Sequence, residues 1–250
     1  MDPLSVIVLF ILTTFVGILV GCVGIGGVLL VPMLTYLLSV DVHIAIASAI
    51  FSYVFSGFIG TFLYARKGSI KWQMTYALFV GAAPGAFLGA FISFFIPKTV
   101  LELFIALLIV SAGLNALIRS KDYPFEDKHL SSYTLLLIGF FVGVGSALSG
   151  TGGPLILVPI LVWCRIAPRT SVGLSQAIQI PIAILGTTGN YLHGTVDFMV
   201  GFYIAISLMV GVSLGAKITH LVTQPFLEKI VAWVLLAVGL FIVVRGIFSF

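Results

Sequence analysis

Two glycine clusters have the residue types and spacing expected of an anion-binding site. Residues 22–32 read CVGIGGVLLVP and residues 149–159 read SGTGGPLILVP, so each cluster interrupts an apolar stretch. Glycine accepts positive φ and leaves no side chain between backbone and ligand. A helix that starts after such a turn presents free N–H groups and about half a positive charge at its N-terminus. Two such ends facing one another would bind a small anion without any arginine.

The candidate substrate ligands come from the two clusters and from the polar residues of two later spans. In the first cluster they are Gly24, Ile25, Gly26 and Gly27, and in the second Ser149, Gly150, Thr151, Gly152 and Gly153. Ser149 and Thr151 could add hydroxyl donors. The candidates in the later spans are Ser48, Ser52, Ser175, Gln176, Gln179 and Asn190.

The polar residues between 170 and 192 form a stripe. Gln176, Gln179, Thr187 and Asn190 fall within about 80° of one face at ~100° per residue. The corresponding span of the first half carries Ser52 and other serines, so the halves offer unequal versions of one stripe. A polar group inside a membrane is costly unless it is paired or wet. The alternative for each residue is an interhelical hydrogen bond that only holds helices together.

Several other residues are expected to be structural. Pro32 and Pro159 are predicted to shape the short segments after the clusters. The spacings of Gly81, Gly85 and Gly89 are typical of helix-packing faces, and an alanine at Gly85 is expected to be far milder than a valine at Gly26 or Gly152. Tyr64 and Tyr191 are predicted interfacial anchors. Cys22 and Cys164 are interpreted as packing residues, and no histidine or cysteine has metal-ligand spacing, so neither a metal nor a cofactor is predicted.

The composition is that of an integral membrane protein. The 250 residues are 60% hydrophobic and 8% charged, with a mean hydropathy of +1.26. Soluble domains are roughly 45–50% apolar and about 25% charged. The net charge of +4 comes from basic residues in short loops, which indicates membrane topology and argues against a nucleic-acid partner. Residues 4–22 lack a basic region and a cleavage site, so they are expected to be a mature helix.

The chain is an internal duplication. Gly24, Gly26 and Gly27 fall on Gly150, Gly152 and Gly153 at an offset of 126 residues. With one inserted residue the offset becomes 127, where these pairs match: Pro32 with Pro159, Leu34 with Leu161, Ser48 with Ser175 and Tyr64 with Tyr191. The offset then returns to 126 for Leu101-Glu102 with Leu227-Glu228 and for Arg119 with Arg245. We therefore predict a first transmembrane repeat at 1–119, a cytoplasmic linker at 120–132 and a second repeat at 133–250.

Each repeat is predicted to contain a glycine-broken helix pair followed by three transmembrane helices. The predicted helices of the first repeat lie near 4–22, 28–38, 43–65, 72–96 and 99–118, and those of the second near 133–149, 154–164, 170–192, 198–222 and 226–248. The second element of each repeat is about 11 residues long, too short to span a ~30 Å hydrocarbon core at ~1.5 Å per residue. The fold class is thus an all-α polytopic membrane protein.

The distribution of basic residues favours inverted repeats. If each broken pair re-enters on its own side, ten lysines and arginines fall on the cytoplasmic side and two outside. The ten are Arg66, Lys67, Lys71, Arg119, Lys121, Lys128, Arg165, Arg169, Lys217 and Lys229, and the two are Lys98 and Arg245. If the broken pair fully crosses, the halves are parallel and the division is seven against five. The sequence leaves re-entry or full crossing open.

The duplicated motifs resemble those of a known family. GIGGVLLVP and GTGGPLILVP, each followed by a span that opens with Ala47-Ser48 or Leu174-Ser175, are similar to motifs of the TauE/SafE family of bacterial transporters, also called the sulfite exporter or TSUP family. The resemblance covers essentially the whole chain. It implies transport of sulfite, sulfoacetate, taurine-derived sulfonates or related organosulfur or carboxylate anions. The residues of this chain that match the family motif by position are Gly24, Gly26, Gly27, Pro32, Gly150, Gly152, Gly153 and Pro159.

The sequence therefore predicts a secondary-type transporter in the cytoplasmic membrane that moves a small anion by alternating access. One alternative is an anion channel with the same helix-terminus site. Another is an intramembrane enzyme, for which HExxH, GxSxG and paired intramembrane acids are all missing. An enzyme is therefore not predicted. The expected partners are the anion and the lipid bilayer; the coupling ion, direction and oligomeric state are not readable.

Overall fold

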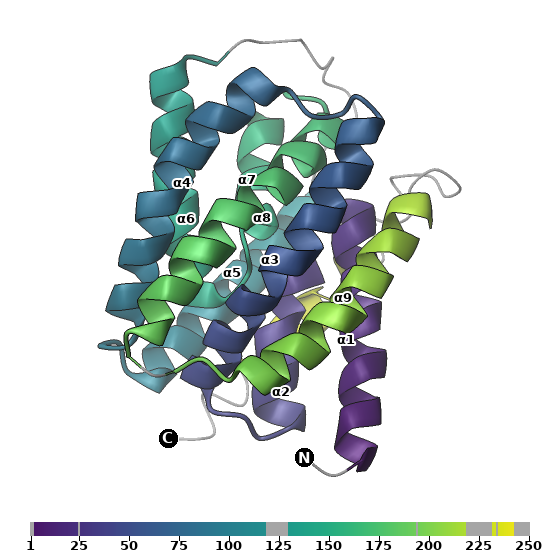
Figure 1. Cartoon of the computed structure of the whole chain (residues 1–250), viewed down its shortest axis with the longest axis vertical. Coiled ribbons are helices and arrows are strands. Elements are labelled where there is room, and N and C mark those ends of the chain that lie inside the picture. Colours follow the sequence, from purple (N-terminus) through teal and green to yellow (C-terminus); the bar gives the residue numbers. More distant parts are fainter. Residues whose placement is uncertain are drawn as a thin grey trace.

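In a computed structural model of the chain, every regular element among the described residues is a helix (Figure 1). The described residues are 3–24, 26–118, 130–193, 195–218, 232–233 and 235–242. In the first half the elements are α1 (Pro3–Val23), η1 (Gly26–Leu29), α2 (Leu30–Leu37), α3 (Val42–Arg66), α4 (Trp72–Ser93) and α5 (Lys98–Ile118). In the second half they are α6 (Ser132–Ser149), α7 (Pro154–Trp163), α8 (Pro168–Tyr191) and α9 (Phe198–Ile218).

The predicted order of long and short helices is confirmed in the described residues, and most boundaries agree within three residues. Residues 232–233 and 235–242 are helical, which fits the last predicted span; the linker and most of that span lie outside the described residues. One boundary differs. The first short helix was expected to start after the glycine cluster, but a 3-10 turn begins inside it, at Gly26, and α2 follows from Leu30.

Glycines let the long helices pack backbone to backbone. A Cβ on Gly85 of α4 would lie 2.2 Å from the carbonyl oxygen of Phe140 on α6, and one on Gly211 of α9 would lie 2.3 Å from that of Thr14 on α1. The packing role expected for these glycines is confirmed. The added methyl group of Gly85→Ala would meet rigid backbone, so a loss of stability is expected there. Its smaller effect on flux than that of Gly26→Val or Gly152→Val stays a prediction.

The two closely packed helix pairs are equivalent to each other when the two repeats are exchanged. α1 packs on α9 and α6 packs on α4, so the first α-helix of each half lies against the fourth α-helix of the other. Contacts advance in the same direction along both helices of each pair: Gly81 meets Leu136, and Gly89 meets Val144. The paired helices are therefore parallel. α3 and α8 cross between the pairs, where Gly57 meets Gln179 (Figure 1).

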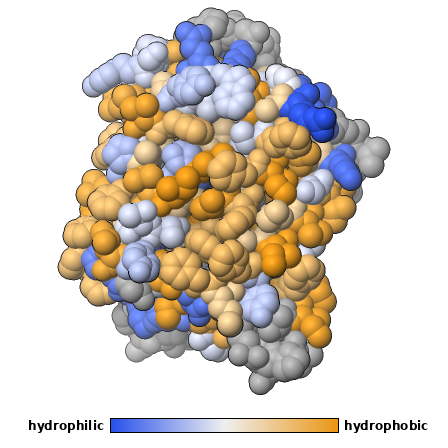
Figure 2. Space-filling view, viewed as in Figure 1, coloured by the Kyte–Doolittle hydropathy of each residue, from blue (hydrophilic) through white to orange (hydrophobic). Residues whose placement is uncertain are grey.

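The outer surface suits a bilayer. Among the described residues, four helices are long and apolar enough to cross a membrane: α3, α4, α6 and α9. Figure 2 shows hydrophobic residues over the middle of one face and strongly hydrophilic residues toward its two ends. Large apolar side chains such as Phe62, Val80 and Leu107 are exposed on the surface, which is expected where lipid replaces water.

Candidate functional site

The two glycine clusters meet inside the protein and form what we call the two tips. A Cβ on Gly27 would lie 3.0 Å from the carbonyl oxygen of Thr151, and both residues are buried. The backbone at the tips is left-handed: φ is +81° at Gly24, +67° at Gly150, +72° at Gly152 and +116° at Gly153. Only glycine adopts these values without strain. Ile25, also a predicted ligand, lies outside the described residues.

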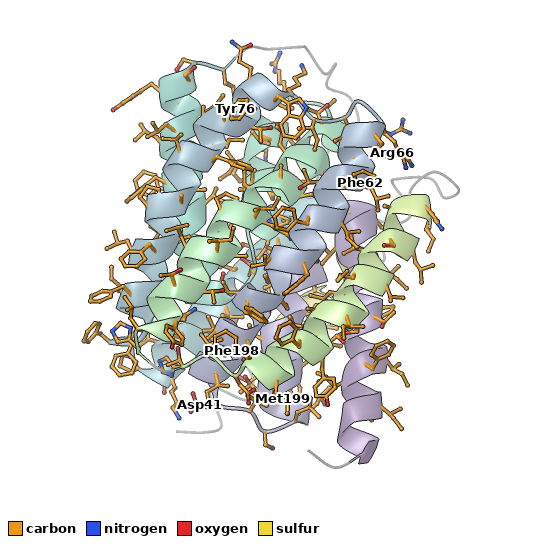
Figure 3. The ribbon with its side chains drawn as sticks, viewed as in Figure 1. Asp41, Phe62, Arg66, Tyr76, Phe198 and Met199 are labelled. Atoms are coloured by element: carbon orange, nitrogen blue, oxygen red, sulfur yellow. The ribbon has the colours of Figure 1, made fainter. Side chains whose placement is uncertain are left out.

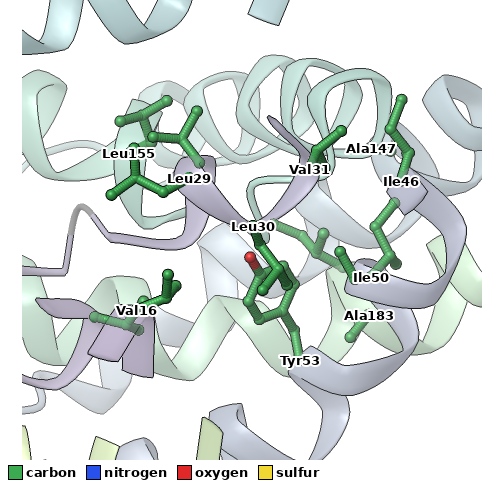
Figure 4. Packing of buried hydrophobic residues seen from close by; sticks show 14 of the residues in the cluster. Val16, Leu29, Leu30, Val31, Ile46, Ile50, Tyr53, Ala147, Leu155 and Ala183 are labelled. Carbon is green, nitrogen blue, oxygen red and sulfur yellow. The ribbon is translucent and has the colours of Figure 1, made fainter. Parts of the chain in front are cut away.

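Tyr53 of α3 joins the tips, and sequence reasoning missed it. Its hydroxyl donates a hydrogen bond of 2.8 Å to the carbonyl oxygen of Gly27. Its ring covers Gly152, where an added Cβ would lie 2.6 Å from the ring. Figure 4 shows Tyr53 among buried apolar side chains with its hydroxyl oxygen beside Leu30. A usable signal was present, because a tyrosine in the middle of an apolar span matches Ile180 in the other repeat.

The second tip presents backbone donors. The N–H groups of Gly150 and Thr151 are bonded to the carbonyl oxygen of Ser146. Within the described residues, the N–H groups of Gly152, Gly153 and Leu155 meet no acceptor, although all three residues are buried. Buried N–H groups without an acceptor are rare in folded proteins. They lie at the N-terminus of α7, where the helix dipole favours negative charge.

The two hydroxyls of the second tip bond locally. Ser149 donates to the carbonyl oxygen of Gly145 at 2.7 Å, and the hydroxyl oxygens of Ser149 and Thr151 lie 3.0 Å apart. Both side chains are buried. Because the single Ser149 proton goes to Gly145, the Thr151 hydroxyl is the donor in the second contact, so the two hydroxyls leave oxygen lone pairs and no free proton at the tip.

The glutamines of α8 have unpaired polar atoms, and Gln176 lies beside the first tip. Gln176 donates from Nε2 to the carbonyl oxygen of Val20 at 3.0 Å, one turn before Gly24. Its Oε1, and both Nε2 and Oε1 of Gln179, are buried without a hydrogen-bond partner among the described residues. Such atoms cost roughly 1–3 kcal/mol each if they stay unpaired. The stripe thus places amide groups where α8 crosses α3.

Other predicted ligands lie elsewhere. Ser48 donates to the carbonyl oxygen of Asp197 at 3.2 Å, at the end of the molecule away from Arg66. Ser52 and Ser175 donate to carbonyl oxygens of their own helices. Asn190 is buried near the end of α8, and its Nδ2 has no partner among the described residues. The contacts of these four residues do not bring them to the tips.

The neighbouring structural predictions have mixed outcomes. Pro32 and Pro159 lie within α2 and α7. Tyr191 is 62% exposed, as an interfacial residue should be, but Tyr64 is only 7% exposed. The Tyr64 hydroxyl donates to the carbonyl oxygen of Gly21 at 3.0 Å, so the prediction of an interfacial anchor is wrong there. Cys22 packs in the interior, with its Sγ 3.1 Å from the carbonyl oxygen of Gly215.

An all-helical fold with several membrane-crossing helices and two buried tips that interrupt the α-helices defines a polytopic membrane protein of the transporter class. The profile of the family described as sulfite exporter TauE/SafE matches residues 9–242. The chain belongs to this family, and it is a multi-pass inner-membrane protein.

Its relatives have matching lengths. YdhB of Bacillus subtilis, a probable membrane transporter protein, is 29% identical over 235 residues, 90% of this chain and 94% of the relative. YunE of the same species, also a probable membrane transporter protein, is 23% identical and covers 96% of this chain and 99% of its own. A probable membrane transporter protein of Methanocaldococcus jannaschii is 26% identical, covering 96% and 94%. No solved structure matches the chain.

Proposed function

We propose that this transporter is a carrier that moves a small anion, either an organosulfur anion such as sulfite or a sulfonate, or a small carboxylate, by alternating access. The observation that supports it most directly is the set of buried N–H groups at the start of α7, on Gly152, Gly153 and Leu155, which meet no acceptor among the described residues. Anion oxygens accept hydrogen bonds from such groups, and these bonds are stronger than neutral ones. The amides of Gln176 and Gln179 would bind the edge of the same ligand.

The chemistry of the donors favours an oxyanion. Sulfite, sulfonates and carboxylates carry two or three oxygens on one centre, which matches several N–H groups converging from one helix terminus. No lysine or arginine lies within the two clusters or along the glutamine stripe. The family description names sulfite export, which agrees with a sulfur oxyanion.

The helix directions support inverted repeats. Since α1 is parallel to α9 and α6 is parallel to α4, the two broken pairs start from opposite ends of the molecule, and α2 and α7 return toward those ends (Figure 1). Re-entry is therefore favoured over full crossing. Exchanging the conformations of two inverted halves would exchange the side on which the tips open, which is the geometric basis of alternating access.

The cationic residues support an orientation. Six of the seven lysines and arginines with described side chains lie at the end that holds the α3–α4 and α7–α8 loops and the end of α9. They are Arg66, Lys67, Lys71, Arg165, Arg169 and Lys217. Lys98 lies at the other end, beside Asp41 (Figure 3). By the positive-inside rule the end with six cations faces the cytoplasm. An anion leaving a negative-inside cell would then gain about 2.3 kcal/mol per charge at ~100 mV.

The contact between the tips favours a carrier over the channel alternative. Gly27 and Thr151 touch, and Tyr53 covers Gly152, so a ligand can reach the free N–H groups only after the tips separate. A channel would need a path that stays open past this contact. Saturable flux stimulated by substrate on the opposite side would support the carrier, and flux far above carrier turnover would support the channel.

The first test is thermal stabilisation of the purified protein by sulfite, sulfoacetate, taurine, sulfate, thiosulfate and small carboxylates, with neutral analogues as controls. A ligand at 100 times its Kd adds about 2.7 kcal/mol, which is roughly 5–11 °C for a chain of this size. We expect a shift for one class of anion, and flux of that anion in liposomes. Gly152→Val should abolish both while the protein still inserts. Stabilisation by neutral or zwitterionic compounds alone would overturn the proposal.

A further inference from the structure

A pocket lies at the end of the molecule with the six cations. A pocket of about 330 Å³ lies between the end of α3, the start of α8 and the last turn of α9. Its walls include four cationic side chains: Arg66, Lys67, Arg169 and Lys217. The rest of the lining is Leu63, Tyr64, Ser69 and Ala216. No aspartate or glutamate lines it among the described residues.

Among the described residues, no carboxylate pairs with the four cations. In the part of the chain that the structure describes, no acidic side chain forms an ion pair with Arg66, Lys67, Arg169 or Lys217, whereas Lys98 at the opposite end pairs with Asp41. Figure 3 shows Arg66 at the edge of the molecule above Phe62, whose ring centroid lies 5.1 Å from its guanidinium carbon. Membrane topology accounts for cations at this end. It does not require cations from three separate segments to line one cavity.

The pocket adjoins the first tip. Tyr64 and Ala216, which line the pocket, belong to one apolar cluster with Val158 and Val172. A Cβ on Gly24 would lie 3.4 Å from Val158 and 3.5 Å from Val172. The hydroxyl of Tyr64 also donates to the carbonyl oxygen of Gly21, one turn before that glycine. A layer of apolar side chains thus separates the cationic pocket from the tips.

We infer that this pocket is a vestibule that binds the transported oxyanion weakly at the cytoplasmic end, and that Tyr64, Val158 and Val172 form the closed gate between it and the tips. This inference rests on the proposed function. Its cations concentrate anions at the entrance by electrostatic attraction, and the apolar layer keeps them out until the tips separate. The binding class is a free sulfur oxyanion or carboxylate, held by guanidinium and ammonium groups.

The test compares flux from the two sides. The variant is Arg169→Gln combined with Lys217→Gln, and both side chains are exposed, so the fold should persist. Uptake of radiolabelled sulfite is measured in inverted vesicles, which present the cytoplasmic end, and in right-side-out vesicles. At low salt we expect the KM from the cytoplasmic end to rise about tenfold, within the range of electrostatic steering. At ~1 M salt, where screening acts within about 3 Å, the difference should fall below about twofold.

The controls separate this inference from the proposed function. Lys98→Gln removes one charge at the opposite end and should leave the KM from the cytoplasmic end unchanged. If the parent protein transports no anion, the proposed function fails. If it transports sulfite and Gly152→Val abolishes flux, but the double variant changes both sides equally or neither, the vestibule fails alone. The vestibule also fails if the effect follows the anionic lipid content of the vesicles and not the salt concentration, because the pocket then holds a lipid headgroup.

Discussion

Gly152→Ala should destabilise the protein through two separate effects. An alanine with the φ of +72° observed there is strained by about 1–2 kcal/mol. Its Cβ would also lie 2.6 Å from the ring of Tyr53, in a site with no free space, and such overpacking costs about 1–3 kcal/mol. The expected sum is about 2–5 kcal/mol. For a chain of 250 residues this lowers Tm by roughly 4–20 °C.

Gly68 provides the matched control. Its φ is +67°, but nothing lies within 4 Å of an added Cβ, so Gly68→Ala carries only the backbone strain and should lower Tm by roughly 2–8 °C. Thermal unfolding in detergent measures both variants. Adding Tyr53→Ala should recover the overpacking part in Gly152→Ala, giving a coupling of about 1–3 kcal/mol in a double-mutant cycle. Equal shifts for the two glycine variants, or strictly additive effects with Tyr53→Ala, would refute the reasoning.

Three further predictions use other parts of the molecule. Gln179→Leu should leave Tm unchanged or raise it, because both unpaired amide atoms disappear. The same variant should abolish flux in liposomes. Lost flux together with a large fall in Tm would indicate that Gln179 has a structural role. Gly85→Ala should lower Tm more than Gly68→Ala, since its methyl group meets the Phe140 carbonyl, and a wild-type Tm would contradict the close packing. Partial burial raises the pKa of Asp41, but hydrogen bonds from Lys98 and the His43 N–H outweigh it and hold the pKa below its ordinary 3.8. Stability from this carboxylate is therefore present above that value and is lost as pH falls through the lower folded-state pKa, so Asp41→Asn should flatten the Tm profile below about pH 4.

The sequence predicted the helices well because the membrane leaves few solutions. Backbone in hydrocarbon must be helical unless protein or water surrounds it, so apolar segments of about 20 residues became helices with nearly the expected bounds. The repeat at an offset of 126 residues also identified the two places where the helix breaks. Gly24, Gly150, Gly152 and Gly153 have positive φ there. A Cβ on Gly26 would lie 2.6 Å from Leu19, and one on Gly27 would lie 2.7 Å from the Tyr53 hydroxyl, so positive φ or close packing explains each of these glycines.

Contacts between distant segments were harder to predict, because no local pattern encodes them. Tyr64 and its match Tyr191 lie at equivalent places near helix ends, yet one is buried against Gly21 and the other is exposed. Tyr53 differs from its match Ile180 in the sequence, but its importance comes from two loops that fold onto it from opposite halves. The effect of an alanine at Gly85 depends on a carbonyl more than fifty residues away.

The differences between the repeats point to unequal roles for the halves. The free N–H groups and Thr151 belong to the second tip, and Gln176 and Gln179 belong to the second half. The residues of the first half that match these three side chains are less polar, and the match of Gln176 is an alanine. The first half contributes Tyr53, which touches both tips. When the tips separate, Tyr53 can remain with only one of them. Its hydrogen bond to Gly27 contributes about 0.5–1.5 kcal/mol, up to about a tenfold change in a conformational equilibrium. If the protein is the carrier proposed above, the second half would therefore supply most of the ligand contacts, while Tyr53 in the first half would bias the equilibrium between closed and open tips.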